Sequence, residues 1–155
     1  MFLGAIGWRW CLTMIVLTYL AITRQGPFGL HPLERFNEVT FNAALLKSVG
    51  ESIGVPLPGG SHGIGLVRSV DFEPWFVARI QAPKERLATL AEAMASHKYV
   101  GASYGIPVWT NAPWWDLSLK NVVASNSYDF KGSAVSIWVA EDKGDLVMYI
   151  YHQIM

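Results

Sequence analysis

A serine and a histidine stand side by side in the glycine-rich stretch Gly59–Gly63, which reads GGSHG. This spacing matches the G-x-S-x-G form of a nucleophile elbow, where a tight turn between a strand and a helix presents the serine hydroxyl. Two prolines precede the stretch and a glycine-spaced, strand-like run follows it, so the motif lacks its structural context. His62 is also too close in sequence to be taken as the base for Ser61. We therefore predict a Gly-rich loop, and a small hydrolase that uses Ser61 is the least favoured alternative.

The histidines show no pattern of metal ligands. They stand at His31, His62, His97 and His152, with no pair three or four residues apart, and the single cysteine is Cys11. Structural and catalytic metal sites usually show closer spacings or supporting cysteines. The scattered carboxylates include no obvious catalytic pair, and no phosphate-binding glycine motif is present. The sequence therefore predicts a protein without metal, cofactor or enzymatic activity.

Tryptophans gather in a proline-containing segment, which includes Pro107–Trp109 and Pro113–Asp116. Rings held by prolines can form a rigid platform for a sugar, a peptide or a membrane interface. The alternative is that the rings cover a sheet face and form a small core of their own. Together with aromatic residues of the C-terminal strands they make up a candidate binding set: Trp109, Trp114, Trp115, Trp138, Tyr149 and Tyr151.

These residues follow an apolar N-terminal run. The stretch from Trp10 to Thr23 carries no charge, but its fourteen residues are short for a helix that must cross about 30 Å of hydrocarbon. Adding residues 2–8 gives sufficient length and places Arg9 about a third of the way in. We expect an uncleaved signal anchor over residues 1–23, with a cleaved export signal and a buried helix of a soluble protein as alternatives.

The flanks of this run indicate how it would sit in a bilayer. Trp8, Arg9, Trp10 and Tyr19 suit positions at the membrane interface. By the positive-inside tendency the N-terminus is assigned to the cytoplasm and the following domain to the far side, a periplasm or its equivalent. Cleavage would instead give a secreted protein.

Composition limits the remaining classes of function and the number of domains. The net charge is zero and the pI about 6.9, so the chain lacks the basic footprint of a nucleic-acid-binding protein. About 130 residues follow the anchor, which is the size of one domain. The only cysteine lies in the apolar run, so we expect a domain without a disulfide that relies on packing, and the chain as a whole has a hydrophobic content of 52%.

The pattern of apolar residues predicts two helices in this domain. Pro32 begins a stretch to Gly50 whose apolar residues recur at three and four positions, as in an amphipathic helix. Pro83 begins a second helix to Ser96, with Leu87, Leu90, Ala91 and Met94 on one side. Residues 99–119 are expected to be irregular.

Two hairpins are predicted to supply the sheet. Strands over residues 64–70 and 75–81 are joined by four residues, and strands over 134–140 and 145–152 flank Glu-Asp-Lys-Gly. Pairing Ala140 with Asp145 sets Val139 opposite Leu146 and puts six apolar side chains on one face: Val135, Ile137, Val139, Leu146, Met148 and Ile150. Ser136, Trp138, Val147, Tyr149 and Tyr151 would share the other face.

The sequence thus predicts an α+β fold: an N-terminal membrane-associated helix (1–23), a linker (24–31) and a single extracytoplasmic domain (32–155). In that domain two hairpins form an antiparallel sheet packed against one or two helices. The expected function is that of a membrane-tethered, non-enzymatic envelope protein that binds a protein partner, for example as an accessory subunit of a membrane complex. Its partners would be the lipid bilayer and that protein, not nucleic acid. An exported binder of a small ligand or cell-wall saccharide is the alternative.

Overall fold

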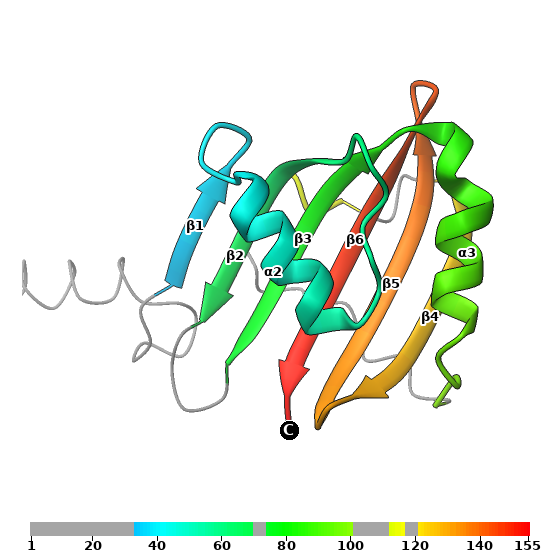
Figure 1. Cartoon of the computed structure of the whole chain (residues 1–155). Coiled ribbons are helices and arrows are strands. Elements are labelled where there is room, and N and C mark those ends of the chain that lie inside the picture. The colour runs from blue at the N-terminus through cyan, green and yellow to red at the C-terminus, as the bar shows by residue number, and fades with distance from the viewer. Residues whose placement is uncertain (1–32, 70–73, 101–111, 117–120) are drawn as a thin grey trace, which may run out of the picture.

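The computed structural model describes residues 33–69, 74–100, 112–116 and 121–155. Over these residues the chain forms one six-stranded antiparallel sheet with strand order β1-β2-β3-β6-β5-β4, and two α-helices (Figure 1). The elements are β1 (Leu33–Asn37), α2 (Ala43–Ile53), β2 (His62–Ser69), β3 (Trp75–Ala82), a short 3-10 turn (Lys84–Arg86), α3 (Leu87–Ala95), β4 (Asn121–Phe130), β5 (Ser133–Asp142) and β6 (Asp145–Ile154). The α+β prediction is confirmed, although the sheet has six strands where two hairpins would give four.

The expected membrane helix and its interface residues Trp8, Arg9, Trp10 and Tyr19 lie outside the described residues. Within the described part of the chain, neither helix has the length and apolar character needed to cross a bilayer.

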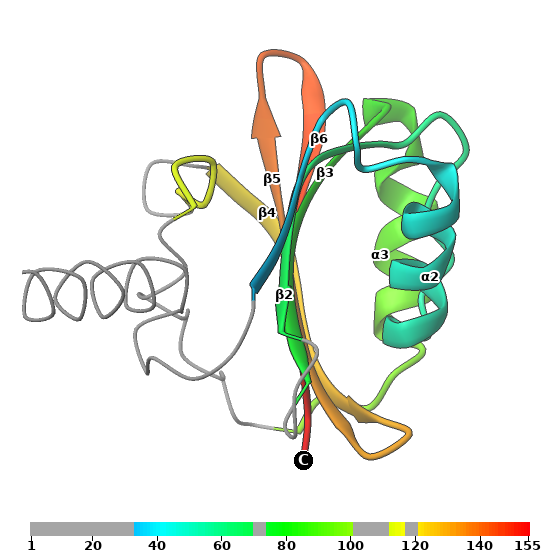
Figure 2. The same cartoon turned by 90° about the vertical axis from the view of Figure 1, so that its left-hand side faces the viewer.

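Both helices lie on the same face of the sheet, which we call the helix face (Figure 2). The main core fills the space between them and the strands, and it includes Ile53 of α2, Leu90 and Met94 of α3, and Ile80 of β3. These side chains are at most 2% exposed. The helices are short, so burial of one apolar side of each against the sheet supplies most of their stability.

The predicted helix over residues 32–50 is wrong in its first half. Residues Leu33–Asn37 form β1, which pairs with β2 from Leu33↔Ser69 to Asn37↔Gly65. Leu33 packs on one face of the sheet and Phe36 on the other. A spacing of three residues places two side chains on one side of a helix but on opposite faces of a strand. Both faces of this sheet carry an apolar cluster, so a strand paired with β2 buries Leu33 on one face and Phe36 on the other.

Local side chains set where α2 begins and ends. The Asn37 side chain accepts hydrogen bonds from the backbone N–H groups of Val39 and Thr40, which turns the chain after β1. The Asn42 side chain caps α2 by accepting from Leu45 N at 3.1 Å. The helix ends at Gly54, whose φ of 69° is the left-handed conformation common after a helix.

The central predictions for residues 64–96 are confirmed. β2 and β3 form an antiparallel hairpin, and the helix predicted after Pro83 is present as the 3-10 turn followed by α3. Leu90 and Met94 are buried, and Leu87 packs partly against the core, as the apolar stripe predicted.

The C-terminal hairpin has the predicted faces and a different register. Val135, Ile137 and Val139 share the main core with the alternate residues of β6, while Trp138 lies on the opposite face. The pairing is shifted by two residues, however, with Asp142 opposite Asp145 and Val139 opposite Met148. The connection is therefore the two-residue turn Lys143–Gly144, both at positive φ (53° and 92°), which suits the twist of a tight hairpin.

β4 has no counterpart among the predicted elements. It pairs with β5 along its whole length and forms one edge of the sheet, with β1 at the other edge. α3 carries the chain from β3 to this far edge, and β6 then returns to the middle of the sheet beside β3 (Figure 1).

Candidate binding surfaces of the sheet

Opposite the helices the sheet carries a second apolar surface, which we call the tryptophan face. It consists of residues from five strands together with the short segment Ala112–Asp116. Its apolar members are Leu33, Val67, Trp75, Val77, Ala112, Trp114, Trp115, Trp138, Ala140, Val147, Tyr149 and Tyr151. Among the described residues, 112–116 is the one segment outside the strands that packs on this face.

Close packing against β2 and β6 positions the two tryptophans of this segment. A side chain at Gly65 would lie about 2.4 Å from Trp114 Cε2, so the indole ring occupies space that only a glycine leaves free. Trp115 contacts Trp114 edge-on at 6.1 Å between ring centroids and Tyr149 edge-on at 5.5 Å. These are favourable aromatic geometries, and they hold the segment against the sheet.

Arg79 of β3 contacts both this segment and the hairpin formed by β5 and β6. Its Nη1 donates to the Trp114 carbonyl at 3.4 Å, and its Nη2 lies 3.3 Å from Asp142 Oδ2. The guanidinium also lies over the Tyr149 ring, 5.6 Å from its centroid. A half-buried cation is thereby neutralised by a carboxylate and an aromatic face, which permits a charge beneath an apolar segment.

The predicted binding residues differ in accessibility. Trp114, Trp115 and Trp138 are partly exposed on the tryptophan face, whereas Tyr149 and Tyr151 are buried, at 0% and 7%. Burial also raises the pKa of Tyr151, whose hydroxyl donates to Gln153 Oε1. Trp109 lies outside the described residues.

Sequence reasoning missed one aromatic residue of this surface. Trp75, the first residue of β3, is partly exposed and packs in the same cluster. Trp75 stands two residues before Val77 in the predicted strand, and this spacing, which places both side chains on one face, was the available signal.

The Gly-rich stretch is a loop that leads into β2, as predicted, and Ser61 lies beside a hollow. This hollow has a volume of about 580 Å³ and is formed by α2 and residues 56–61. The Ser61 hydroxyl is buried without a hydrogen-bond partner in the described part of the chain, so no described histidine engages it. The hollow is lined mainly by apolar groups, and its charged residues Lys47 and Glu51 pair with each other at 3.8 Å.

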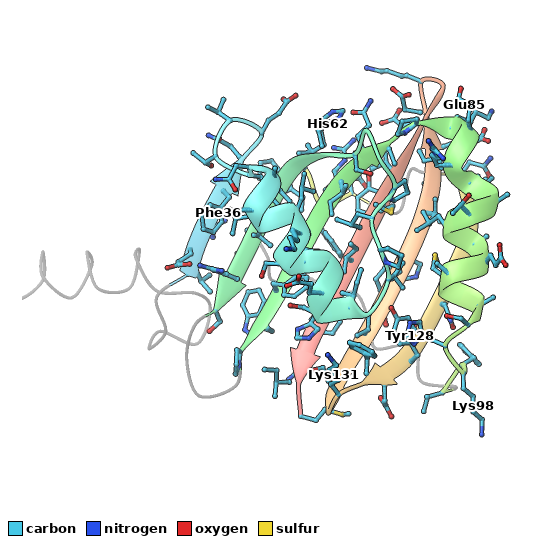
Figure 3. All side chains as sticks on the ribbon, viewed as in Figure 1. Phe36, His62, Glu85, Lys98, Tyr128 and Lys131 are labelled. Carbon is cyan, nitrogen blue, oxygen red and sulfur yellow. The ribbon has the colours of Figure 1, made fainter. Side chains whose placement is uncertain are left out.

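The three described histidines occupy separate places. His62 is exposed at the opposite end of the sheet from Tyr128 (Figure 3). His97 stacks on Tyr128 with 4.3 Å between ring centroids, and His152 stacks on Phe76 at 4.6 Å. Across the described ranges no three His, Cys, Asp or Glu residues come together in a way that could hold a metal ion.

The two edges of the sheet differ in chemistry. β1 is five residues long and carries charge, with Glu34 paired to Arg68. β4 is ten residues long and contains no charged residue from Asn121 to Tyr128. Four exposed apolar side chains lie along it, namely Tyr99 (61%), Val100 (42%), Val122 (42%) and Val123 (39%). We call this surface the β4 edge.

Comparison with protein-family models, with curated proteins and with solved structures finds no match for this chain. Its function therefore has to be argued from the surfaces described above.

Proposed function

We propose that this chain is a membrane-tethered, non-enzymatic envelope protein whose domain binds a protein partner through the tryptophan face, as an accessory subunit of a membrane complex. One observation carries the proposal. Four tryptophans, Trp75, Trp114, Trp115 and Trp138, lie partly exposed on one face of the sheet.

Half-buried tryptophans suit recognition better than fully exposed ones. Each ring on this face is held by neighbours, so little conformational entropy is lost on binding, and each keeps an accessible part for contact. Binding hot spots in protein interfaces are enriched in tryptophan held in this way.

The apolar N-terminal run supports the tether. Thr23 is its last residue, and nine residues separate it from Leu33, which packs in the tryptophan face. Nine residues span at most about 30 Å when fully extended. An anchored domain would thus keep this face close to the bilayer, where a membrane-embedded partner could be reached.

The test is to express the full chain with a C-terminal tag, solubilise the membranes in mild detergent and identify co-purifying proteins by mass spectrometry. We expect residues 1–23 to be retained and one membrane protein to co-purify in stoichiometric amount. Trp114→Ala should lose that companion. Phe76→Ala, which truncates a half-buried aromatic residue on the helix face, should keep it.

A processed protein that begins near Arg24 and purifies alone would contradict the tether and the partner. Equal retention of a companion by both variants would contradict the use of the tryptophan face.

The hollow beside Ser61 favours a second candidate function, the binding of a small apolar ligand by an exported domain. Its volume of about 580 Å³ falls in the range of small-molecule sites. The variant Ser61→Ala distinguishes ligand binding from hydrolysis. A ligand site should tolerate the change with modestly altered affinity, whereas a hydrolase using Ser61 would lose all turnover.

A further inference from the structure

The hollow beside Ser61 runs along the whole length of α2. Its lining residues on the helix extend from the first residue, Ala43, to the C-cap residue Gly54, and residues 56–61 form the other wall. The two walls face each other because the chain after α2 runs back beside the helix (Figure 1). At a rise of about 1.5 Å per residue, the helix wall is about 16 Å long. The volume of about 580 Å³ then corresponds to a mean cross-section of about 36 Å², so the hollow is long and narrow.

The walls of this hollow are held in place by the local sequence. Pro56 and Pro58 fix the backbone φ angle at two positions of the loop wall. Gly50 of α2 allows this loop to approach closely, because a side chain there would lie 3.3 Å from Val55 O. A site that is already rigid loses little conformational entropy when a ligand enters.

The hollow has few polar side chains, and they are not spread evenly. Lys47 and Glu51 pair with each other at 3.8 Å and are 79% and 68% exposed, so they lie at the rim and leave no uncompensated charge. The Ser61 hydroxyl has no hydrogen-bond partner in the described part of the chain. It lies toward the start of α2, since Gly63 packs directly against Phe41, which just precedes the helix. One end of the hollow therefore offers an unpaired hydroxyl, and the other end is apolar.

We propose that the hollow beside Ser61 binds a linear fatty acid of about twelve carbons, with its polar head at the Ser61 end. This inference rests on the second candidate function, the binding of a small apolar ligand, and it names the class of that ligand. With carbon–carbon bonds of about 1.5 Å, an extended chain of about twelve carbons matches the length of the helix wall. Carbon atoms in van der Waals contact lie about 4 Å apart, so the mean cross-section suits one such chain.

The experiment exposes the full chain in its membranes to dodecanoic acid that carries a photoreactive diazirine at the far end, and maps the labelled peptides by mass spectrometry. With the head at the Ser61 end, we expect labelling at residues 54–57. Ala43→Trp places a large side chain in the hollow and should reduce this labelling by about tenfold or more. Ala44→Trp is the matched control, because Ala44 is exposed at the next position of α2 and does not line the hollow.

Two competing acids with the same number of carbons test the shape of the site. Compared at equal concentration in the membrane, unlabelled dodecanoic acid should suppress the labelling about tenfold more effectively than 1-adamantaneacetic acid, whose carbons form a compact cage. Equal competition by the two acids would overturn the linear ligand and leave the second candidate function standing.

Labelling in the described domain that falls outside residues 43–61, or that is equal in Ala43→Trp and Ala44→Trp, would overturn both the linear ligand and the ligand site. Trp114→Ala should be labelled as strongly as the wild type, because Trp114 lies on the opposite face of the sheet from α2. The result is thus separable from the loss of a companion protein at the tryptophan face.

Discussion

Side chains of β4 hold the C-terminal ends of both helices. The Tyr128 hydroxyl donates to Ile53 O at 2.7 Å at the end of α2. Asn126 Nδ2 donates to Met94 O at 2.6 Å at the end of α3, and His97 Nε2 lies 3.1 Å from Gly54 O. The last carbonyls of a helix have no i+4 partner within it, and these side chains donate to carbonyls at that end. Met94 O also accepts from His97 N at 3.2 Å. Figure 3 shows Tyr128 at this end of the helix layer.

Removing the Tyr128 hydroxyl should therefore destabilise the fold. Tyr128 is fully buried, and burial raises its pKa, so the hydroxyl remains a donor. Tyr128→Phe leaves Ile53 O without that donor, and we expect a loss of about 1–3 kcal/mol in the free energy of unfolding, measured by urea titration. Tyr99→Phe, at a ring 61% exposed, is the control and should change stability by less than about 0.5 kcal/mol.

His152 should make stability depend on pH. It is 7% exposed and stacked on Phe76, and burial lowers its pKa from the usual 6.5. The unfolded chain then binds a proton more readily than the folded one, so stability is full above about pH 6.5 and falls as the pH drops from there toward the lowered value. His152→Gln should flatten this part of the stability–pH curve, whereas the same change at exposed His62 should preserve the slope. An unchanged slope in His152→Gln would show that another group causes it.

At the scale of the elements, the alternation of apolar and polar residues predicted which face of the sheet each side chain of the C-terminal hairpin occupies. It did not predict how the two strands of that hairpin pair. The side chains of β5 and β6 were assigned to the correct faces because a strand repeats every two residues. A slip of two residues leaves every face unchanged, so alternation cannot distinguish the true pairing from one shifted by two. The positive φ values of Lys143 and Gly144, which tighten the turn, selected the observed register.

The two missed strands are the edges of the sheet, and they were missed for different reasons. β1 pairs with β2, from which α2 separates it in the sequence, so no local pattern predicts the pairing. β4 joins β5 through the two-residue turn Lys131–Gly132, both at positive φ, which is a local signal for a hairpin. However, β4 contains Asn, Ser and Asp, which have low strand propensity in isolation. The candidate binding site was likewise predictable only in part. The face of Trp138 followed from alternation, whereas the burial of Tyr149 depends on Trp115 packing over it.

The packing of Trp114 against Gly65 of β2 can be tested by mutation. In Gly65→Ala the new methyl group would lie about 2.4 Å from Trp114, so the indole must move. We expect a loss of about 1–3 kcal/mol in the free energy of unfolding, measured by urea titration. We also expect faster proteolytic cleavage at residues 112–116. Gly59→Ala, with nothing within 4 Å of the new methyl group, should match the wild type. Equal behaviour of the two variants would mean that Trp114 is not held against Gly65.

For the molecule as a whole, the sheet divides into two sets of three strands that meet along one seam. β1, β2 and β3 form one set and β4, β5 and β6 the other, and all eight residues of β3 pair with β6 from Trp75↔Gln153 to Ala82↔Leu146. The tryptophan face extends across this seam, with Val77 and Tyr151 on its two sides. A partner bound there would contact both sets of strands and so stabilise the pairing of β3 with β6.

The central position of β6 has a consequence for the timing of biosynthesis. Every other strand leaves the ribosome before it, yet the two halves can join only after residues 145–154 have been made. Until then β3 and β5 each lack the neighbouring strand β6, so the middle of the sheet cannot form. A central strand that is synthesised after the other five therefore postpones closure of the sheet until nearly all of the domain has been made.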